Sequence, residues 1–253
     1  MDIKRIIILF MVLPITAFSQ FEKLVNTFND AIGTVTEKKM TLLFIDAQNA
    51  KPVSEAAIDI NEIGEFTTNL AGRIVIDPQY DDTYTLKFDK VGYIQSSYTF
   101  EVVGGSIPNN KIAVSSEMMP EAIRIVLVWG KEPADLDAHF VKENGFHISS
   151  KVAPDPREKS AKLDRSDNTS YGPETITIAN PDSLSIYTYY VKNYSGKDAL
   201  KSLALSKSGA MVQVYKNNLL EKTYTVPPEQ KGTVWTVFTI KNGKILDLNE
   251  IGN

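Results

Sequence analysis

The chain contains no cysteine. Disulfide bridges, thiolate metal ligands and cysteine nucleophiles are therefore excluded, and so is a lipid-modified N-terminal cysteine. The folded chain must instead be held together by burial of apolar side chains. Its 253 residues are enough for two domains with cores of ordinary size.

Histidine is also scarce, and positive charges are not in excess. The chain has two histidines, and 27 basic residues stand against 31 acidic ones, for a net charge of −4. The charges are interspersed and form no basic stripe, which argues against nucleic acid or an anionic membrane surface as a partner. With so few nitrogen ligands and no thiolate, a zinc site would have to be built largely from carboxylates.

A hydrophobic run long enough for a membrane span, about 20 residues, is missing as well. The longest run, Ile6 to Ile15, follows Lys4 and Arg5 and precedes the small-x-small pattern of residues 17–19. This order predicts a signal peptide over residues 1–19, and an uncleaved N-terminal anchor is the alternative. We expect an exported protein, periplasmic or extracellular, that is not a lipoprotein and has no span in its mature chain.

Residues 20–34 are predicted to form one short amphipathic helix. Their apolar residues recur at helical spacing, and Gly33 is placed as a C-cap. The apolar positions are Phe21, Leu24, Val25, Phe28 and Ile32.

From residue 35 to 119 the pattern changes to six or seven short β-runs separated by turn residues, which predicts a small antiparallel sandwich. Three segments occur in order, KPVSEAAIDI, TTNLAGRIVI and YTLKFDKVGY. Together they resemble the carboxypeptidase regulatory-like domain, a transthyretin-like β-sandwich, over about residues 40 to 103. The resemblance implies a scaffold or spacer and transfers no catalytic residue.

Residues 120–253 are predicted to form a second, larger sandwich of eight or nine strands. IRIVLVW opens it, and Asn144-Gly145 suits the tight turn of a hairpin over residues 138–149. The motifs IRIVLVWG, LDRSDNTSYGPETITI and YYVKNYS resemble the YfaP-like family of exported bacterial Ig-like modules, over about residues 121 to 240. The predicted fold class is thus all-β, with two antiparallel sandwiches in tandem.

Two acidic segments of the second domain form the candidate site. Asp135, Asp137 and His139 are spaced two apart, so in a strand they would share a face. A second group would complete an oxygen-rich site of the kind that calcium prefers; its members are Asp164, Asp167 and Glu174.

Calcium is therefore the expected ion if a cation binds here, with His139 as the weakest member of the set. The alternative is that these acids cap turns and bind loop backbone. The segment from Asp164 fails as an EF-hand, because Thr169 and Thr175 stand where glycine and glutamate are required.

Other chemistry is weakly indicated. The two histidines, His139 and His147, flank the proposed hairpin turn and are expected to be ordinary cross-strand residues. Neither lies in an HExxH pattern, and no G-x-S-x-G elbow occurs. Four tyrosines could stack on sugars, although packing is the simpler expectation; they are Tyr187, Tyr189, Tyr190 and Tyr194.

The sequence thus predicts a non-catalytic exported binding or scaffolding module, with an unknown protein or glycan partner at the cell envelope. Its functional end would be the acidic loops, because loops cluster at the ends of a sandwich. Two alternatives stay open. One is a hydrolase acting on polysaccharide or peptide with the acidic cluster and His139, and the other is a purely structural spacer.

Overall fold

The computed structural model describes residues 39–153 and 159–253. The predicted signal peptide and the predicted helix of residues 20–34 lie outside these residues. Within them the chain is all-β, as expected, with seventeen strands and no helix. No segment of this part of the chain is a helix of the length and apolarity that crossing a membrane requires.

Seven strands form the first two sheets. A three-stranded sheet has the order β4-β1-β7, and a four-stranded sheet the order β3-β2-β5-β6. The strands are β1 (Met40–Asp46), β2 (Ala57–Ile60), β3 (Gly64–Thr67), β4 (Arg73–Ile76), β5 (Asp82–Asp89), β6 (Ser96–Val102) and β7 (Lys111–Val114).

These strands bury alternate side chains, as the sequence pattern predicts. In β6, Tyr98, Phe100 and Val102 are buried while the residues between them are exposed. One pairing differs from the expected antiparallel arrangement, because β7 runs parallel to β1. Strands β2 to β6 lie between β1 and β7 in the sequence and supply the long connection that a parallel pair needs, whereas a tight hairpin turn would have forced antiparallel pairing.

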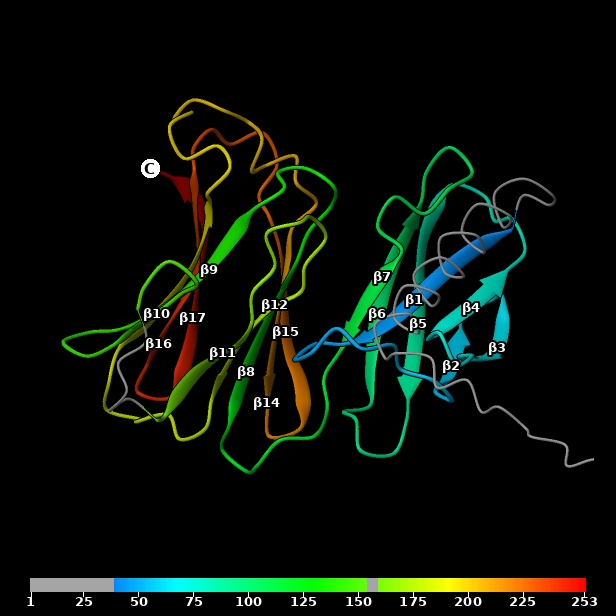
Figure 1. The fold of residues 1–253 in the computed structure, drawn as a ribbon, viewed down its shortest axis with the longest axis horizontal. Helices are drawn as coiled ribbons and strands as arrows, with labels where there is room; N and C mark the ends of the chain where they lie inside the picture. Colours follow the sequence, from blue (N-terminus) through cyan, green and yellow to red (C-terminus); the bar gives the residue numbers. More distant parts are fainter. Residues whose placement is uncertain (1–38, 154–158) are drawn as a thin grey trace, which may run out of the picture. The chain divides into compact units, whose positions relative to one another are not determined.

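Ten strands form two five-stranded sheets, with the orders β10-β9-β13-β16-β17 and β11-β12-β8-β14-β15, which Figure 1 shows as two layers. Their apolar faces enclose one core that contains both tryptophans, Trp129 and Trp235. The strands are β8 (Ile123–Val128), β9 (Leu136–Lys142), β10 (His147–Ile148), β11 (Ala161–Arg165), β12 (Glu174–Ile178), β13 (Tyr187–Asn193), β14 (Met211–Lys216), β15 (Leu219–Thr225), β16 (Val234–Lys241) and β17 (Lys244–Gly252).

Strand β8 is buried along its whole length, which explains its uninterrupted apolar sequence. Ile125 points into the core between the five-stranded sheets. Val126, on the opposite face, belongs to a second apolar cluster that includes Ile45 of β1 and Ala113 of β7. Arg124 is also buried on that face, where its guanidinium donates a hydrogen bond of 2.6 Å to the hydroxyl of Ser115.

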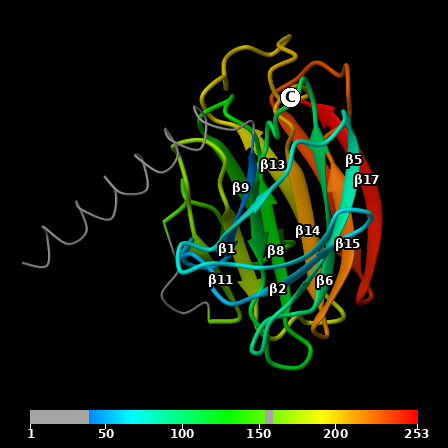
Figure 2. The ribbon, with the colours of Figure 1, turned by 90° about the vertical axis from the view of Figure 1, so that its right-hand side faces the viewer.

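Strands β15 and β17 run beside each other at one edge of the two layers (Figure 2). Asp247 of β17 joins them, because its Oδ1 accepts hydrogen bonds from Lys222 Nζ, at 2.6 Å, and from the hydroxyl of Tyr224. At the hairpin between β9 and β10, Asn144 has the positive φ of 55° that the sequence predicts for a tight turn.

Candidate functional site

Trp129 organises the loops at one end of the five-stranded sheets. Its ring is buried directly after β8, and its Nε1 donates to the backbone oxygen of Pro133 at 2.9 Å. On the other side, Gly172 packs so closely on the ring that a Cβ there would lie 2.7 Å from its Cζ3. The loop before β9 and the loop before β12 therefore both contact one side chain, and the hydrogen bond from Ser170 N to Ala134 O joins the two loops directly.

A third loop joins these two at Asp135. The hydroxyl of Ser195, just after β13, accepts a hydrogen bond from the backbone nitrogen of Asp135 at 2.8 Å. The backbone nitrogen of Tyr194 in turn donates to the carbonyl oxygen of Asp135 at 3.0 Å. At this end of the sheets, three loops that are far apart in the sequence are therefore joined by hydrogen bonds.

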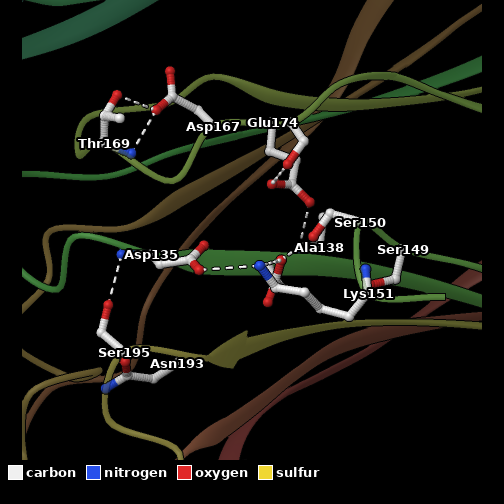
Figure 3. Close-up of polar contacts among 12 residues, drawn as sticks. Asp135, Ala138, Ser149, Ser150, Lys151, Asp167, Thr169, Glu174, Asn193 and Ser195 are labelled. Atoms are coloured by element: carbon white, nitrogen blue, oxygen red, sulfur yellow. Dashed lines mark hydrogen bonds and ion pairs between the residues drawn. The ribbon is translucent and has the colours of Figure 1, made fainter.

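Lys151 brings Asp135 and Asp137 together, as Figure 3 shows for Lys151 and Asp135. Its Nζ lies 3.1 Å from Asp135 Oδ2 and 3.5 Å from Asp137 Oδ1. The hydroxyl of Ser150 also donates to Asp137 Oδ1. Asp135 and Asp137 therefore share one ammonium group, although Asp135 lies just before β9 and not, as the sequence spacing predicts, on a face of that strand.

Asp137 is an unusual carboxylate because it is 0% exposed. Its Oδ2 is buried and has no hydrogen-bond partner among the described residues. Burial raises the pKa of Asp137 above its ordinary value, the hydrogen bond from Ser150 opposes this, and the charge of Asp135 adds to it. The pKa of Lys151 is raised too: burial lowers it, but the hydrogen bond to Asp135 and the charge of Asp137 outweigh that effect.

Glu174 reaches across from the opposite sheet. It is 0% exposed, and its Oε1 accepts a hydrogen bond of 3.0 Å from the backbone nitrogen of Ala138 in β9 (Figure 3). Burial raises the pKa of Glu174 to about 8, the hydrogen bond from Ala138 opposes the rise, and the nearby charge of Asp137 adds to it. Glu174 is therefore largely protonated at neutral pH.

Asp164 and Asp167 have their partners elsewhere. Asp164 accepts a hydrogen bond from the hydroxyl of Thr177, which alternates along β12 with the core-facing Ile176, and it lies 3.2 Å from Lys162. Asp167 closes its own loop, because its Oδ1 accepts from the backbone nitrogen of Thr169 at 2.8 Å and its Oδ2 pairs with Arg165. For Asp167 this is the turn-capping role that stood as the alternative to metal binding.

The expected five-carboxylate calcium site is not assembled in residues 39–153 and 159–253. Among these residues no group of three or more histidine, cysteine, aspartate or glutamate side chains could hold a metal ion. The reason is that Asp164 and Glu174 leave the β11–β12 hairpin on opposite faces, so they cannot converge. Calcium binding stays a prediction that this arrangement does not favour.

His139 is 6% exposed and lies on the face of β9 that carries Asp137. Its Nδ1 is 2.9 Å from His147 Nε2, and its ring stacks on Tyr190 at 4.5 Å between centroids. Burial lowers the pKa of His139 to about 4, and the charges of His147 and Lys192 lower it further. The two histidines are thus the cross-strand pair that the hairpin predicts, and both are uncharged at neutral pH.

A hollow of about 290 Å³ opens beside Ser195. Its lining includes one acid and one base, Glu132 and Lys207, and the full set is Glu132, Pro133, Asn193, Ser195, Gly196, Ala204 and Lys207. Tyr194, which lies between Asn193 and Ser195 in the sequence, is 38% exposed. Lys151 Nζ lies 4.2 Å from the centroid of its ring and Lys197 Nζ 5.3 Å.

Sequence reasoning missed Lys151, Ser150 and the hollow. Nothing in the local pattern around Lys151 indicates that it turns back onto β9, so only the register of β10 on β9 could have suggested it. For the tyrosines the expectation of packing is confirmed at Tyr187 and Tyr189, which are buried in the core. Tyr194 is the exception, because it lies just past the end of β13.

No protein-family model, no curated protein and no solved structure matches this chain. The resemblances to the carboxypeptidase regulatory-like domain and to the YfaP-like family therefore stay predictions from the sequence motifs.

Proposed function

We propose that this protein is an exported, non-catalytic binding module whose ligand is an anionic glycan of the cell envelope. The observation that carries the proposal is the hollow lined by Ser195, Asn193 and Lys207, together with the exposed Tyr194, which lies between Asn193 and Ser195 in the sequence. Hydroxyl and amide groups can bind sugar hydroxyls, and an exposed aromatic ring can stack on a sugar face.

The lysines around Tyr194 favour a negatively charged ligand. Lys197 lies over Tyr194 and is exposed, and the acid nearest to Lys151 is already paired with it, whereas Lys207 shares the lining of the hollow with one acid, Glu132. Ammonium groups beside an aromatic ring would meet the carboxylates of an acidic sugar while the ring contacts its carbon face.

Burial argues against the hydrolase alternative. The carboxyl groups of Asp137 and Glu174 are 0% exposed, so a substrate in the hollow could not reach them. Glu132 is the one acid in the lining of the hollow, whereas glycoside hydrolysis ordinarily needs two carboxyl groups that flank the scissile bond. His139 is equally enclosed and uncharged.

The test is binding to polygalacturonate, with dextran as the neutral comparison, by isothermal titration. We expect binding to polygalacturonate that weakens with added salt, and a loss of about tenfold, or about 1.4 kcal/mol, in each of Tyr194→Ala and Lys207→Ala. Lys244→Ala, on the exposed start of β17, is the matched control and should bind like the original chain.

Two results would overturn this proposal. Equal affinity for dextran would remove the role of charge, and no binding to either polymer would leave the structural spacer as the better interpretation. Release of new reducing ends from either polymer, lost in Glu132→Gln, would favour the hydrolase instead.

A further inference from the structure

The surroundings of Asp137 pose a physical problem. Its carboxyl group is fully buried, yet only Oδ1 has partners, Ser150 and Lys151, and Oδ2 has none among the described residues. A buried charged oxygen without a hydrogen bond is strongly unfavourable in a folded protein. The amine nitrogen of Lys151 lies 3.5 Å from Oδ1 of the same carboxyl group.

We propose that Lys151 Nζ and Asp137 Cγ join in an intramolecular amide bond, an isopeptide cross-link, with Glu174 transferring the protons. The bond would convert the buried carboxylate into a neutral amide and leave no charged oxygen without a partner. This inference concerns the covalent structure of the chain and does not depend on the proposed ligand.

The reaction balances without any co-reactant. The Lys151 ammonium passes one proton to the Asp137 carboxylate, which gives a neutral amine and a neutral acid. The amine nitrogen then attacks Cγ, and Oδ1 takes up the developing negative charge, where the Ser150 hydroxyl already donates. Glu174 gives its proton to Oδ2 and regains one from the nitrogen, so the C–Oδ2 bond breaks and one water molecule leaves.

Asp137 and Glu174 are suited to their steps by their surroundings, whereas the raised pKa of Lys151 opposes the loss of its proton. The pKa of Glu174 is raised to about 8 by burial, so at neutral pH it still holds the proton that the leaving oxygen needs. The pKa of Asp137 is raised by burial as well, which eases proton transfer from the ammonium. Glu174 is held against β9 by its bond to Ala138 N, which Figure 3 shows, and the charge of Asp137 acts on it.

Condensation in water is ordinarily unfavourable, but here both reactants are fixed by the fold. Effective concentrations of well-oriented groups reach about 10⁵ M or more. Exclusion of water from Asp137 also slows the reverse hydrolysis. The lack of cysteine gives the bond a structural use, since an exported chain without disulfides has no other covalent staple of its own.

Asp135 is the competing acceptor. Its Oδ2 is closer to Lys151 Nζ, at 3.1 Å, and its Oδ1 is also buried without a partner among the described residues. Its side chain is 15% exposed, however, and Asp137 is the acid whose charge acts on Glu174. We therefore assign the bond to Asp137, and the two sites can be separated by fragmentation.

The test is peptide mass spectrometry on the full chain, denatured and digested with trypsin. An amide at Lys151 blocks cleavage there, so residues 132–142 and 143–157 should appear as one branched species, lighter than their sum by one water molecule. Fragment ions should place the branch at Asp137. The Asp137→Ala and Lys151→Arg chains should give separate peptides, because a guanidinium is too weak a nucleophile to form the bond.

Glu174→Gln tests the proton transfer. We expect its cross-linked fraction, at a fixed time after synthesis, to fall about a hundredfold, whereas Glu143→Gln in the exposed turn should leave it unchanged. Full-mass, separate peptides from the original chain would overturn the cross-link, and a branch at Asp135 would overturn its assignment. An unchanged fraction in Glu174→Gln would overturn the part given to Glu174.

Discussion

At the scale of single residues, the side chain of Glu174 connects the two five-stranded sheets near one end. It leaves β12, crosses the space between the sheets and accepts a hydrogen bond from Ala138 N, at a position of β9 that pairs with β13 on one side but is not reached by β10 on the other. Without this acceptor a buried backbone donor would have no partner, which costs about 1–3 kcal/mol. A glutamine at position 174 could accept the same hydrogen bond from Ala138 N, and it cannot ionise.

We expect Glu174→Gln to remove a loss of stability that develops as the pH rises from about 5 to about 8. The folded-state pKa of about 8 lies above the ordinary value of 4.5, so ionisation favours the unfolded chain. The stability that the protonated form contributes is complete below the ordinary value and is lost as the pH rises through about 8. Between about pH 5 and about pH 9, the chain with Glu174 should lose a few kcal/mol more than the variant.

The measurement is the urea midpoint at both pH values, made in Lys151→Arg chains so that no cross-link contributes. Glu143→Gln, in the exposed turn, is the control and should follow the parent. A parallel decline in all three chains would show that Glu174 does not set the pH dependence.

At the scale of elements, β8 is distinguished by burial on both faces. Its neighbours β12 and β14 pair with it along its length, and its side chains alternate between two apolar clusters. In an ordinary half-exposed strand, adjacent side chains differ sharply in their contribution to stability.

We therefore expect two adjacent substitutions in β8 to be costly. Ile125→Ala, in the core between the five-stranded sheets, should destabilise by about 2–5 kcal/mol. Val126→Ala, on the other face, should cost at least about 1 kcal/mol, because Val126 is also 0% exposed. Val91→Ala, at a 98% exposed position, should change the unfolding free energy by less than about 0.5 kcal/mol. Urea unfolding measures all three, and a neutral Val126→Ala would contradict burial of the second face.

At the scale of the whole molecule, the two apolar clusters share β8 and β14. Loss of either cluster would expose side chains of the strands that support the other. Both tryptophans lie in the larger cluster, so their fluorescence reports on that cluster alone, whereas far-ultraviolet circular dichroism reports on all the strands.

We expect thermal unfolding by tryptophan fluorescence and by circular dichroism to coincide in one transition. Chains with Tyr215→Phe, which removes the 2.9 Å hydroxyl contact between Tyr98 and Tyr215, should keep a single transition at a lower midpoint. A circular dichroism transition that precedes the fluorescence transition would show that the clusters unfold independently.

The sequence by itself determined the all-β class, most strand positions, the burial of both tryptophans and the turn at Asn144. These follow from local signals, namely the alternation of apolar residues, β-branched composition and turn chemistry. It placed Asp137 and His139 on one face of a strand, because residues two apart in a strand point to the same side.

Only the tertiary structure decided which remote groups meet them. A strand has two faces, and the choice of face for Asp164 and Glu174 depends on which sheet packs on which side of β12. That choice separated the expected calcium ligands and placed Lys151 and Glu174 around Asp137 instead. Residue spacing fixes contacts inside one element, whereas contacts between elements depend on packing energies summed over the whole core.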